Sequence, residues 1–216
     1  MESMKQGFAS IPTIRRLPMY LHLLNKLQND GREFVSSTFI SEKLKLEAIQ
    51  VRKDLAITGI IGKPKVGYYV PALIESIEKY LGWDNNADAF LVGAGSLGSA
   101  LLGYSGFQKR GLNIVAAFDA DSAKVGTNVR GKEITSLDKM PELAQRMGVK
   151  MGIISVPDEY AQSVADLMVA AGILAIWNFT PSNLQVPEGI IIQNEDLSCG
   201  LAVLSVKLAK VLNEGN

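Results

Sequence analysis

The chain has 216 residues, 47% of them hydrophobic and 20% charged, which is typical of a globular protein with one large domain or two small ones. No apolar stretch approaches the roughly 18 to 20 residues that span a bilayer, and the first ten residues lack the pattern of a signal peptide. Cys199 is the single cysteine, so an internal disulfide is excluded. We therefore expect a cytoplasmic protein with neither a metal nor a membrane among its partners.

Net charge is zero, but it is unevenly distributed along the chain. Residues 1–82 carry 12 Lys+Arg against 8 Asp+Glu, and residues 83–216 carry 10 against 14, which gives +4 and −4. A basic first third joined to an acidic remainder is typical of a nucleic-acid-binding domain attached to a different domain. Chance differences of this size also arise between any two domains. The stretch LGWDNNADA (81–89) is the best linker candidate, so we place the domain boundary near residue 83.

Three helices and a basic turn are expected before this boundary, followed by a further helical pattern, PALIESIEKYLG (71–82), that ends at the linker. Leucines at helical spacing predict a helix over 14–31, and two shorter helices are expected over 36–46 and 46–59. The segment GKPKVGYYV (62–70) predicts a tight basic turn that enters a short strand. This order is typical of a winged helix-turn-helix domain.

The third helix and the basic turn supply side chains suited to DNA. Glutamine can bond adenine, arginine can bond guanine, and lysine contacts phosphate without reading sequence. The alternative is a solvated amphipathic helix followed by a basic loop. We predict that the DNA-binding residues are Gln50, Arg52, Lys53, Lys63, Lys65 and Tyr68.

Beyond the boundary the chain alternates strand and helix. The expected strands are apolar on both faces, which indicates a parallel sheet covered by helices on both sides. Helices are expected over 96–107 and 157–172. Strands are expected over 89–93, 113–119, 151–156, 173–179 and 190–194. The predicted fold class is α/β, with an N-terminal winged helix-turn-helix domain (1–82) and a C-terminal Rossmann-like parallel sheet (83–198).

Residues 90–104, FLVGAGSLGSALLGY, contain the G-x-G-x-x-G spacing of a dinucleotide-binding loop. Gly93 permits the tight turn, Gly95 lets the backbone approach the pyrophosphate, and Gly98 lets helix and strand pack closely. A merely structural glycine turn is the alternative. Asp119 lies 21 residues after Gly98, at the end of the second strand. A carboxylate there can bond both ribose hydroxyls and repel a 2′-phosphate, which favours NAD(H) over NADP(H).

Two further loops leave strand ends that should face the same ligand, because open sheets of this type bind ligands beyond the carboxyl ends of their strands. They are SVPD (155–158) and NFTP (178–181), with ordinary turns as the alternative. The predicted cofactor-binding residues are Gly93, Ala94, Gly95, Ser96, Leu97, Gly98, Asp119, Val156, Pro157, Asn178, Phe179 and Thr180.

The chain offers few groups for acid–base chemistry. Its single histidine, His22, lies in the first predicted helix, and no lysine stands at helical spacing from Tyr104 or Tyr160. We therefore expect no catalytic residues and a nucleotide that is bound without being consumed. An NAD-dependent oxidoreductase, or a nucleotide-sensing module without DNA binding, remains the alternative.

The sequence resembles the Rex family of bacterial redox-sensing transcriptional repressors along nearly its whole length. The segments that carry the resemblance are TIRRLPMYL (13–21), QVRKDL (50–55), GYYV (67–70), VGAGSLGSALLGY (92–104), AAFDAD (116–121), SVPDEYAQSVADLMVAAGI (155–173), NFTPSNLQVPEGI (178–190) and EDLSCGLAVLS (195–205).

The resemblance implies a homodimer that binds a palindromic operator in double-stranded DNA, with NAD+ permitting binding and NADH releasing it. It also implies a redox switch formed by an Arg of the first helix, a Tyr that ends the glycine-loop helix and an Asp of the D-L segment. On this chain these are Arg16, Tyr104 and Asp196, with Arg15 as a near competitor for the first.

The C-terminal segment independently favours dimerisation. A terminal helix that is apolar on more than one face needs burial beyond its own sheet. Members of the family insert this helix into the partner subunit, so we predict a swapped dimerisation helix over 199–216. Its apolar residues are Leu197, Leu201, Leu204, Leu208 and Val211 on one face, and Val203 and Val206 on a second.

Overall fold

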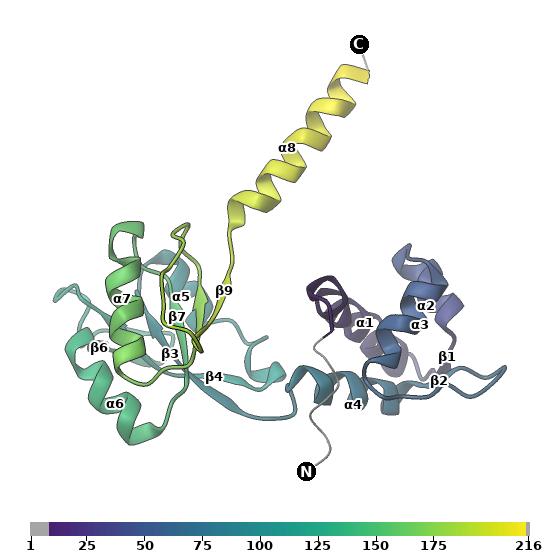
Figure 1. The fold of residues 1–216 in the computed structure, drawn as a ribbon, viewed down its shortest axis with the longest axis horizontal. Helices are drawn as coiled ribbons and strands as arrows, with labels where there is room; N and C mark the ends of the chain where they lie inside the picture. The colour runs from purple at the N-terminus through teal and green to yellow at the C-terminus, as the bar shows by residue number, and fades with distance from the viewer. Residues whose placement is uncertain (1–8, 215–216) are drawn as a thin grey trace. The chain divides into compact units, whose positions relative to one another are not determined.

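The computed structural model describes residues 9–214, and contacts within it divide the chain into two units, Met1–Asn85 and Asn86–Asn216 (Figure 1). The division falls inside the predicted linker, 81–89. The outer limits of the predicted domains, residues 1 and 216, lie outside the described residues.

The first unit is a small helical domain with a two-stranded antiparallel sheet. Its core joins leucines of the first helix to apolar residues of the helices that follow, including the fully buried Leu17, Leu24 and Leu55. Helices and strands follow one another as in a winged helix-turn-helix. Their bounds are α1 (Ile11–Asn29), β1 (Phe34–Val35), α2 (Ser37–Leu44), α3 (Ala48–Ala56), β2 (Tyr68–Tyr69) and α4 (Val70–Leu81).

The wing is the hairpin between α3 and β2. Lys63 and Gly67 bridge its two arms through reciprocal backbone hydrogen bonds of 2.8 and 2.9 Å, and Lys65 adopts a positive φ of 61° near its tip. Gly67 is required where the wing meets β1, because an added Cβ would lie 2.3 Å from the carbonyl oxygen of Val35. The strand β2 then pairs antiparallel with β1.

The second unit is built on a seven-stranded sheet in the order β5-β6-β4-β3-β7-β8-β9, parallel except for the β5–β6 pair. When its parallel strands are numbered along the chain from β3, their order is 3-2-1-4-5-6, that of a Rossmann fold. The strands are β3 (Ala87–Val92), β4 (Leu112–Asp119), β5 (Asn128–Val129), β6 (Lys132–Ser136), β7 (Met151–Ile154), β8 (Ala175–Asn178) and β9 (Ile191–Asn194).

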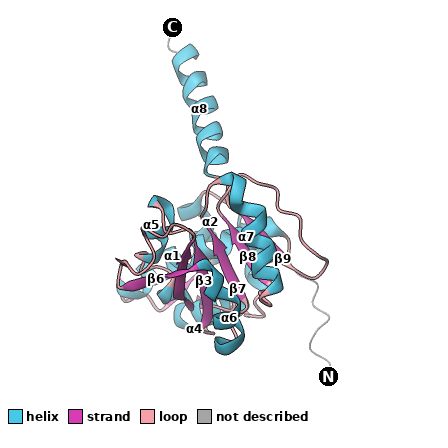
Figure 2. Ribbon diagram, turned by 90° about the vertical axis from the view of Figure 1, so that its left-hand side faces the viewer, coloured by secondary structure: helices cyan, strands magenta, loops and turns pink. Residues whose placement is uncertain are grey.

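Each face of this sheet has its own apolar core, and Figure 2 shows the strands among the helices that cover them. Phe90 and Val92 of β3 pack with helices α6 (Met140–Met147) and α7 (Asp158–Ala170). Leu91, between them, packs on the opposite face with Leu101 and Leu102 of α5 (Ser96–Leu102). The alternation explains why the buried part of the strand, Ala89–Val92, is apolar at every position.

Three expectations about elements are corrected. The helix expected over 96–107 ends at Leu102, and a turn leads to the short 3-10 helix η1 (Gln108–Arg110). The helix expected over 46–59 ends at Ala56, before Gly59 with its φ of 80°. The strands β5 and β6 and the helix α6, with the 3-10 helix η2 (Leu137–Lys139) before it, were not predicted, because their sequences contain no apolar run.

The last helix, α8, runs from Leu197 to Glu214 and leads away from the sheet (Figure 1). It begins two residues before the expected start at 199. The described apolar side chains of both predicted faces are between 56% and 71% exposed, so none of residues 9–214 of the same chain covers this helix. The side chain of Leu197 lies outside the described part. None of the helices described is long and apolar enough to cross a membrane.

Candidate nucleotide and nucleic-acid sites

The strand order of the sheet reverses between β3 and β7, and the loops that follow these two strands interlock. An added Cβ on Gly93, whose φ is 103°, would stand 2.5 Å from the carbonyl oxygen of Ser155. In return, the Ser155 hydroxyl donates a hydrogen bond of 2.9 Å to the Gly93 carbonyl oxygen. Ligands of open parallel sheets bind in the crevice at such a reversal.

The glycines of the loop differ in what surrounds them. A Cβ on Gly98 would lie 1.8 Å from the carbonyl oxygen of Gly93, so helix α5 can pack against the loop only with glycine there. Among residues 9–214, no atom lies within 4 Å of a Cβ built on Gly95. The fold thus requires Gly93 and Gly98 but leaves the space at Gly95 open, as a bound pyrophosphate would need. Ala94, Ser96 and Leu97 complete the predicted loop.

Asp119, at the end of β4, is 8% exposed and is held from three directions. Its Oδ2 accepts hydrogen bonds from the Ala94 amide at 2.8 Å and the Lys124 ammonium at 3.0 Å. Its Oδ1 accepts one from the Asp121 amide at 2.9 Å. Burial raises the pKa of Asp119, but these bonds outweigh it and hold that pKa below its ordinary value. Among the described residues Oδ1 accepts this one bond, so an acceptor site remains for a ribose hydroxyl.

The two other predicted loops serve the site differently. Val156 lies against Gly93 at the strand reversal, and Pro157 immediately precedes helix α7. Asn178 is fully buried, and its amide nitrogen donates to Asn194 Oδ1 at 2.9 Å. Its oxygen accepts from the amide and the hydroxyl of Thr180 at 3.0 and 2.8 Å. These two side chains therefore shape the loop around Phe179 rather than offer free polar groups.

Four aromatic rings form a row on the side of the sheet that α5 covers. Ring centroids are 4.8 Å apart for Tyr104 and Phe107, 5.5 Å for Phe107 and Trp177, and 4.9 Å for Trp177 and Phe179. Among the described residues, the buried Nε1 of Trp177 has no hydrogen-bond partner. Sequence reasoning missed Phe107 and Trp177, although for Trp177 an aromatic residue within an apolar strand was a usable signal.

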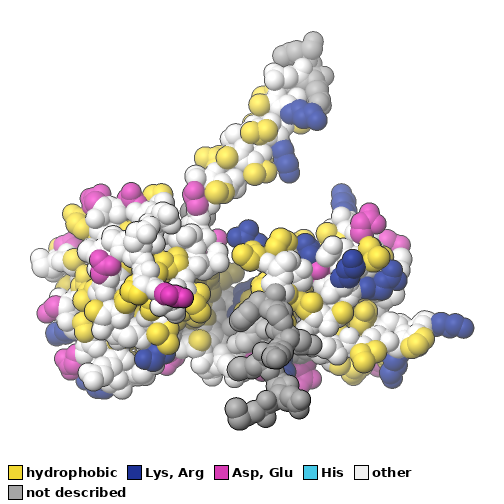
Figure 3. Space-filling model, in the orientation of Figure 1, with side chains coloured by type: hydrophobic (Ala, Val, Ile, Leu, Met, Phe, Trp, Pro, Cys, Tyr) yellow, Lys and Arg dark blue, Asp and Glu magenta, His cyan; other side chains and the backbone are white. Residues whose placement is uncertain are grey.

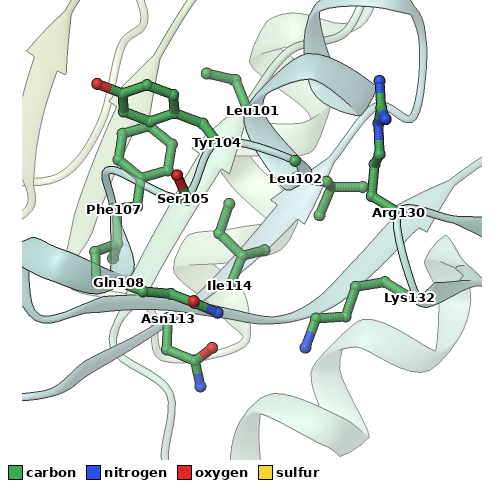
Figure 4. A pocket seen from close by; sticks show the side chains of 12 residues that line it. Leu101, Leu102, Tyr104, Ser105, Phe107, Gln108, Asn113, Ile114, Arg130 and Lys132 are labelled. Atoms are coloured by element: carbon green, nitrogen blue, oxygen red, sulfur yellow. The ribbon is translucent and has the colours of Figure 1, made fainter.

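Tyr104 is 53% exposed and lines a cavity of about 310 Å³ (Figure 4). Figure 4 shows Tyr104 and Phe107 on one side of this cavity and Arg130 and Lys132 on the other. The cavity is formed by the end of α5, the start of β4 and the β5–β6 hairpin. Tyr104 therefore follows the end of α5 remote from the glycine loop.

The first unit presents basic side chains on α3 and on the wing. Arg52, Lys53, Lys63 and Lys65 are all exposed, and Figure 3 shows Lys and Arg side chains gathered over this unit, including the tip of its protruding loop. Tyr68 is half-buried, with its ring packed against Gly62. The electrostatic requirement of a DNA-binding face is met here.

Arg16, predicted as a switch residue, is bound by a carboxylate that sequence reasoning missed. Its Nε and Nη2 donate to Asp54 Oδ2 and Oδ1 at 2.5 and 2.8 Å. The Tyr20 hydroxyl donates to Asp54 Oδ2 at 2.6 Å, and Gln50 Nε2 donates to Oδ1 at 2.7 Å. The partner of Arg16 in the structure is thus Asp54 of its own unit. The hydrogen bond from Arg16 to Asp54 raises the pKa of Arg16 above its usual range.

Asp196, the third predicted switch residue, precedes helix α8. Its Oδ1 accepts a hydrogen bond of 2.8 Å from the Ser198 amide. The Ser198 side chain, and after it this amide, hold the pKa of Asp196 below its ordinary value. The structure shows the contacts of each predicted switch residue separately. That the three residues act together as a redox switch stays a prediction. Within residues 9–214, no group of three His, Cys, Asp or Glu side chains is arranged to hold a metal ion.

Comparisons with known proteins agree with this division of the chain. Residues 10–56 match the family described as putative DNA-binding protein N-terminus, and residues 84–182 match the family described as CoA binding domain. The redox-sensing transcriptional repressor Rex of Treponema denticola is 50% identical over 204 residues, 94% of this chain and 97% of that protein.

Two solved structures of RSP, a Rex-family repressor, are similar to nearly the whole chain. One, in complex with beta-NAD+ and operator DNA, has a TM-score of 0.89 at 35% identity and covers 96% of each chain. The other, in complex with beta-NADH, has a TM-score of 0.86 at 34% identity and covers 97% of this chain and 99% of that one.

Proposed function

The chain belongs to the Rex family of redox-sensing transcriptional repressors, and from this premise we propose that it binds operator DNA and releases it when NADH binds. The observation that carries the proposal is one chain that joins an exposed basic recognition helix to a dinucleotide cradle with open space at Gly95. The RSP complexes with beta-NAD+ and operator DNA, and with beta-NADH, support the two ligand states.

The proposed DNA contacts are of two kinds, those to bases and those to phosphates. We assign Arg52 on α3 to a base edge, and Lys53, Lys63 and Lys65 to phosphates, since ammonium groups position a protein on DNA without reading its sequence. Tyr68 supports the wing. Because operator DNA lies in the cytoplasm, we place the protein there.

The cofactor assignment follows from the fit of the cradle. The loop from Gly93 to Gly98 would surround the pyrophosphate, and Asp119 would bond the ribose and repel a 2′-phosphate. Val156, Pro157 and the loop around Phe179 would lie beside the nicotinamide half. The nicotinamide supplies a ring whose charge differs between its two redox forms. Since His22, the one histidine, lies in the first unit, we propose that the ring is sensed and not turned over.

We further propose a homodimer held together by α8. Its apolar faces are exposed in the single chain, and a palindromic operator calls for a two-fold symmetric partner. Light scattering at micromolar concentration should give twice the chain mass. Leu204→Glu should reduce it to the mass of one chain, whereas Asp138→Asn, on the exposed surface away from α8, should not. A monomeric wild-type protein would refute the dimer.

The proposed switch joins Arg16, Tyr104 and Asp196. A switch in which Arg16 moves to another acid costs free energy, because the buried carboxylate of Asp54 is then left without its cation. Breaking such a pair costs about 3–5 kcal/mol, so a new contact has to be at least comparably strong. We therefore assign the mobile part of the switch to Tyr104 and Asp196, which are exposed, and a supporting part to Arg16.

The decisive experiment titrates the full-length protein onto labelled palindromic duplexes with NAD+ and NADH added in turn. We expect binding with NAD+, and at least tenfold weaker binding with saturating NADH. Lack of any cofactor effect on DNA binding would defeat the proposal. Steady oxidation of NADH by the protein, with a range of carbonyl compounds supplied, would favour the oxidoreductase alternative.

A further inference from the structure

The recognition helix α3 carries a buried acid that faces inward while its basic residues face out. Asp54 is 1% exposed, and Gln50 stands one helical turn before it. A carboxylate removed from water in this way is tolerated only when its oxygens are satisfied by donors. Here those donors come from two helices, with Arg16 and Tyr20 on α1 and Gln50 on α3 itself.

The bond to Asp54 determines which end of the Gln50 amide is inward. An ionised carboxylate can only accept hydrogen bonds, so it selects the amide nitrogen of glutamine and turns the amide oxygen away. The Nε2–Oδ1 distance of 2.7 Å is that of a charge-assisted bond, which fixes the side chain before any ligand arrives. Gln50 is half-buried, and its remaining polar groups are the amide oxygen and one N–H.

Arg16 and Tyr20 keep the Asp54 carboxyl group ionised, which is the form that orients the Gln50 amide. Burial raises the pKa of Asp54, but hydrogen bonds from Arg16, Tyr20 and Gln50 outweigh it and hold that pKa below its ordinary value. The carboxyl group is therefore ionised at neutral pH and cannot donate to the Gln50 amide. Its position is fixed by the two-pronged bond from Arg16, which spans 38 residues of sequence.

We propose that Asp54 is a positioning residue that makes Gln50 present its amide oxygen to the operator, so that α3 selects adenine at the contacted position. In the major groove, adenine offers an amino donor beside the N7 acceptor, which match the amide oxygen and the remaining N–H of Gln50. Guanine and thymine present a carbonyl oxygen where the amino group is needed. The inference rests on the proposed operator binding and names one base of the sequence that it recognises.

The test uses the full-length protein with NAD+ and an operator duplex selected by the protein itself from random sequence. Each adenine is replaced in turn by purine, which lacks the 6-amino group, and affinity is measured by fluorescence anisotropy. Wild-type protein should lose about tenfold at one position in each half-site, the loss expected for one specific base contact. Gln50→Ala should bind more weakly and show no further loss there.

Asp54→Asn tests the positioning role. It should abolish the discrimination between adenine and purine at that position while the salt dependence of binding, set by phosphate contacts, stays unchanged. Glu47→Gln is the matched control, because it removes one negative charge at the exposed start of the same helix and should keep the discrimination. Combined with Gln50→Ala, Asp54→Asn should add no further loss of discrimination.

The outcomes separate clearly. If the wild-type protein selects no operator, the proposed function fails and the inference fails with it. If it binds an operator but no purine replacement weakens binding, or Gln50→Ala keeps the effect, operator binding stands and the inference is overturned. The purine series on wild-type protein decides this even if Asp54→Asn does not fold. Retained discrimination in a folded Asp54→Asn variant would remove Asp54 from the recognition of the base.

Discussion

Two variants in the glycine loop, Gly95→Ala and Gly98→Ala, distinguish a glycine that the ligand needs from one that the fold needs. Each variant adds one methyl group. In Gly95→Ala the new methyl meets no atom of the described residues within 4 Å, and the backbone at φ −74° and ψ −165° is ordinary for alanine. Stability should therefore be unchanged or rise by about 0.4–1 kcal/mol, the usual effect of replacing glycine at a compatible position. The same methyl occupies space that the pyrophosphate needs.

Gly98→Ala places its methyl 1.8 Å from the Gly93 carbonyl oxygen, against the 3.0 Å below which Cβ contacts essentially do not occur. Helix α5 would have to move by about 1.2 Å, the difference between these two distances. Overpacking of this kind costs about 1–3 kcal/mol, and more where backbone must shift. Gly98→Ala should therefore lose both stability and cofactor affinity.

Urea unfolding gives the stability of both variants, and titration followed by NADH fluorescence gives their affinity. We expect Gly95→Ala to unfold like the wild type and to bind NADH at least tenfold more weakly, which is about 1.4 kcal/mol or more. NADH should then release less operator DNA from Gly95→Ala than from the wild-type protein. Unchanged NADH affinity in Gly95→Ala would refute the assignment of this space to the pyrophosphate, because the methyl would be harmless there.

Three further predictions concern single side chains. Asp119→Ala should weaken NADH binding and let NADPH compete, as measured by the same titration; a loss of NADPH exclusion alone would show that the acid acts only by repulsion. Arg52→Ala should lose about 1–3 kcal/mol of operator affinity if it bonds a base, and unchanged affinity in a gel shift would remove it from the site. The depressed pKa values of Asp54 and Asp119 stabilise the fold at pH above the unfolded value of about 4, and this contribution is lost as pH falls through the folded values. The free energy of unfolding should thus fall as pH drops below about 5 and through the folded pKa values, and less steeply in Asp119→Ala; parallel curves would contradict this.

Features encoded by nearby residues could be predicted from the sequence. The strand before Gly93, the loop, the helix after it and Asp119 all lie within residues 87–119 and are specified by apolar runs and glycine spacing. The strands β5 and β6 could not be found this way. β5, at the edge of the sheet, has only two residues, and β6, between β5 and β4, has Ile134 as its one buried apolar residue, so neither contains an apolar run.

Long-range pairing accounts for what was missed in the first unit. In sequence, Asp54 is one more charge on an amphipathic helix. Its burial depends on Arg16 and Tyr20, which precede it by 38 and 34 residues. Asn178 shows a second difficulty. A polar residue that follows a strand can bind a ligand or form hydrogen bonds within its own loop, and the sequence is the same in both cases. Here its hydrogen bonds are made within the protein.

The aromatic row gives the chain an optical property. Trp177 is one of two tryptophans, and its ring lies between Phe107 and Phe179, the second of which follows the strand end at the nucleotide edge. Reduced nicotinamide absorbs light where tryptophan emits, whereas the oxidised ring does not. Excitation of the protein should therefore pass energy to one redox form of the bound cofactor and not to the other. The emission spectrum of the unlabelled chain then reports which form it holds.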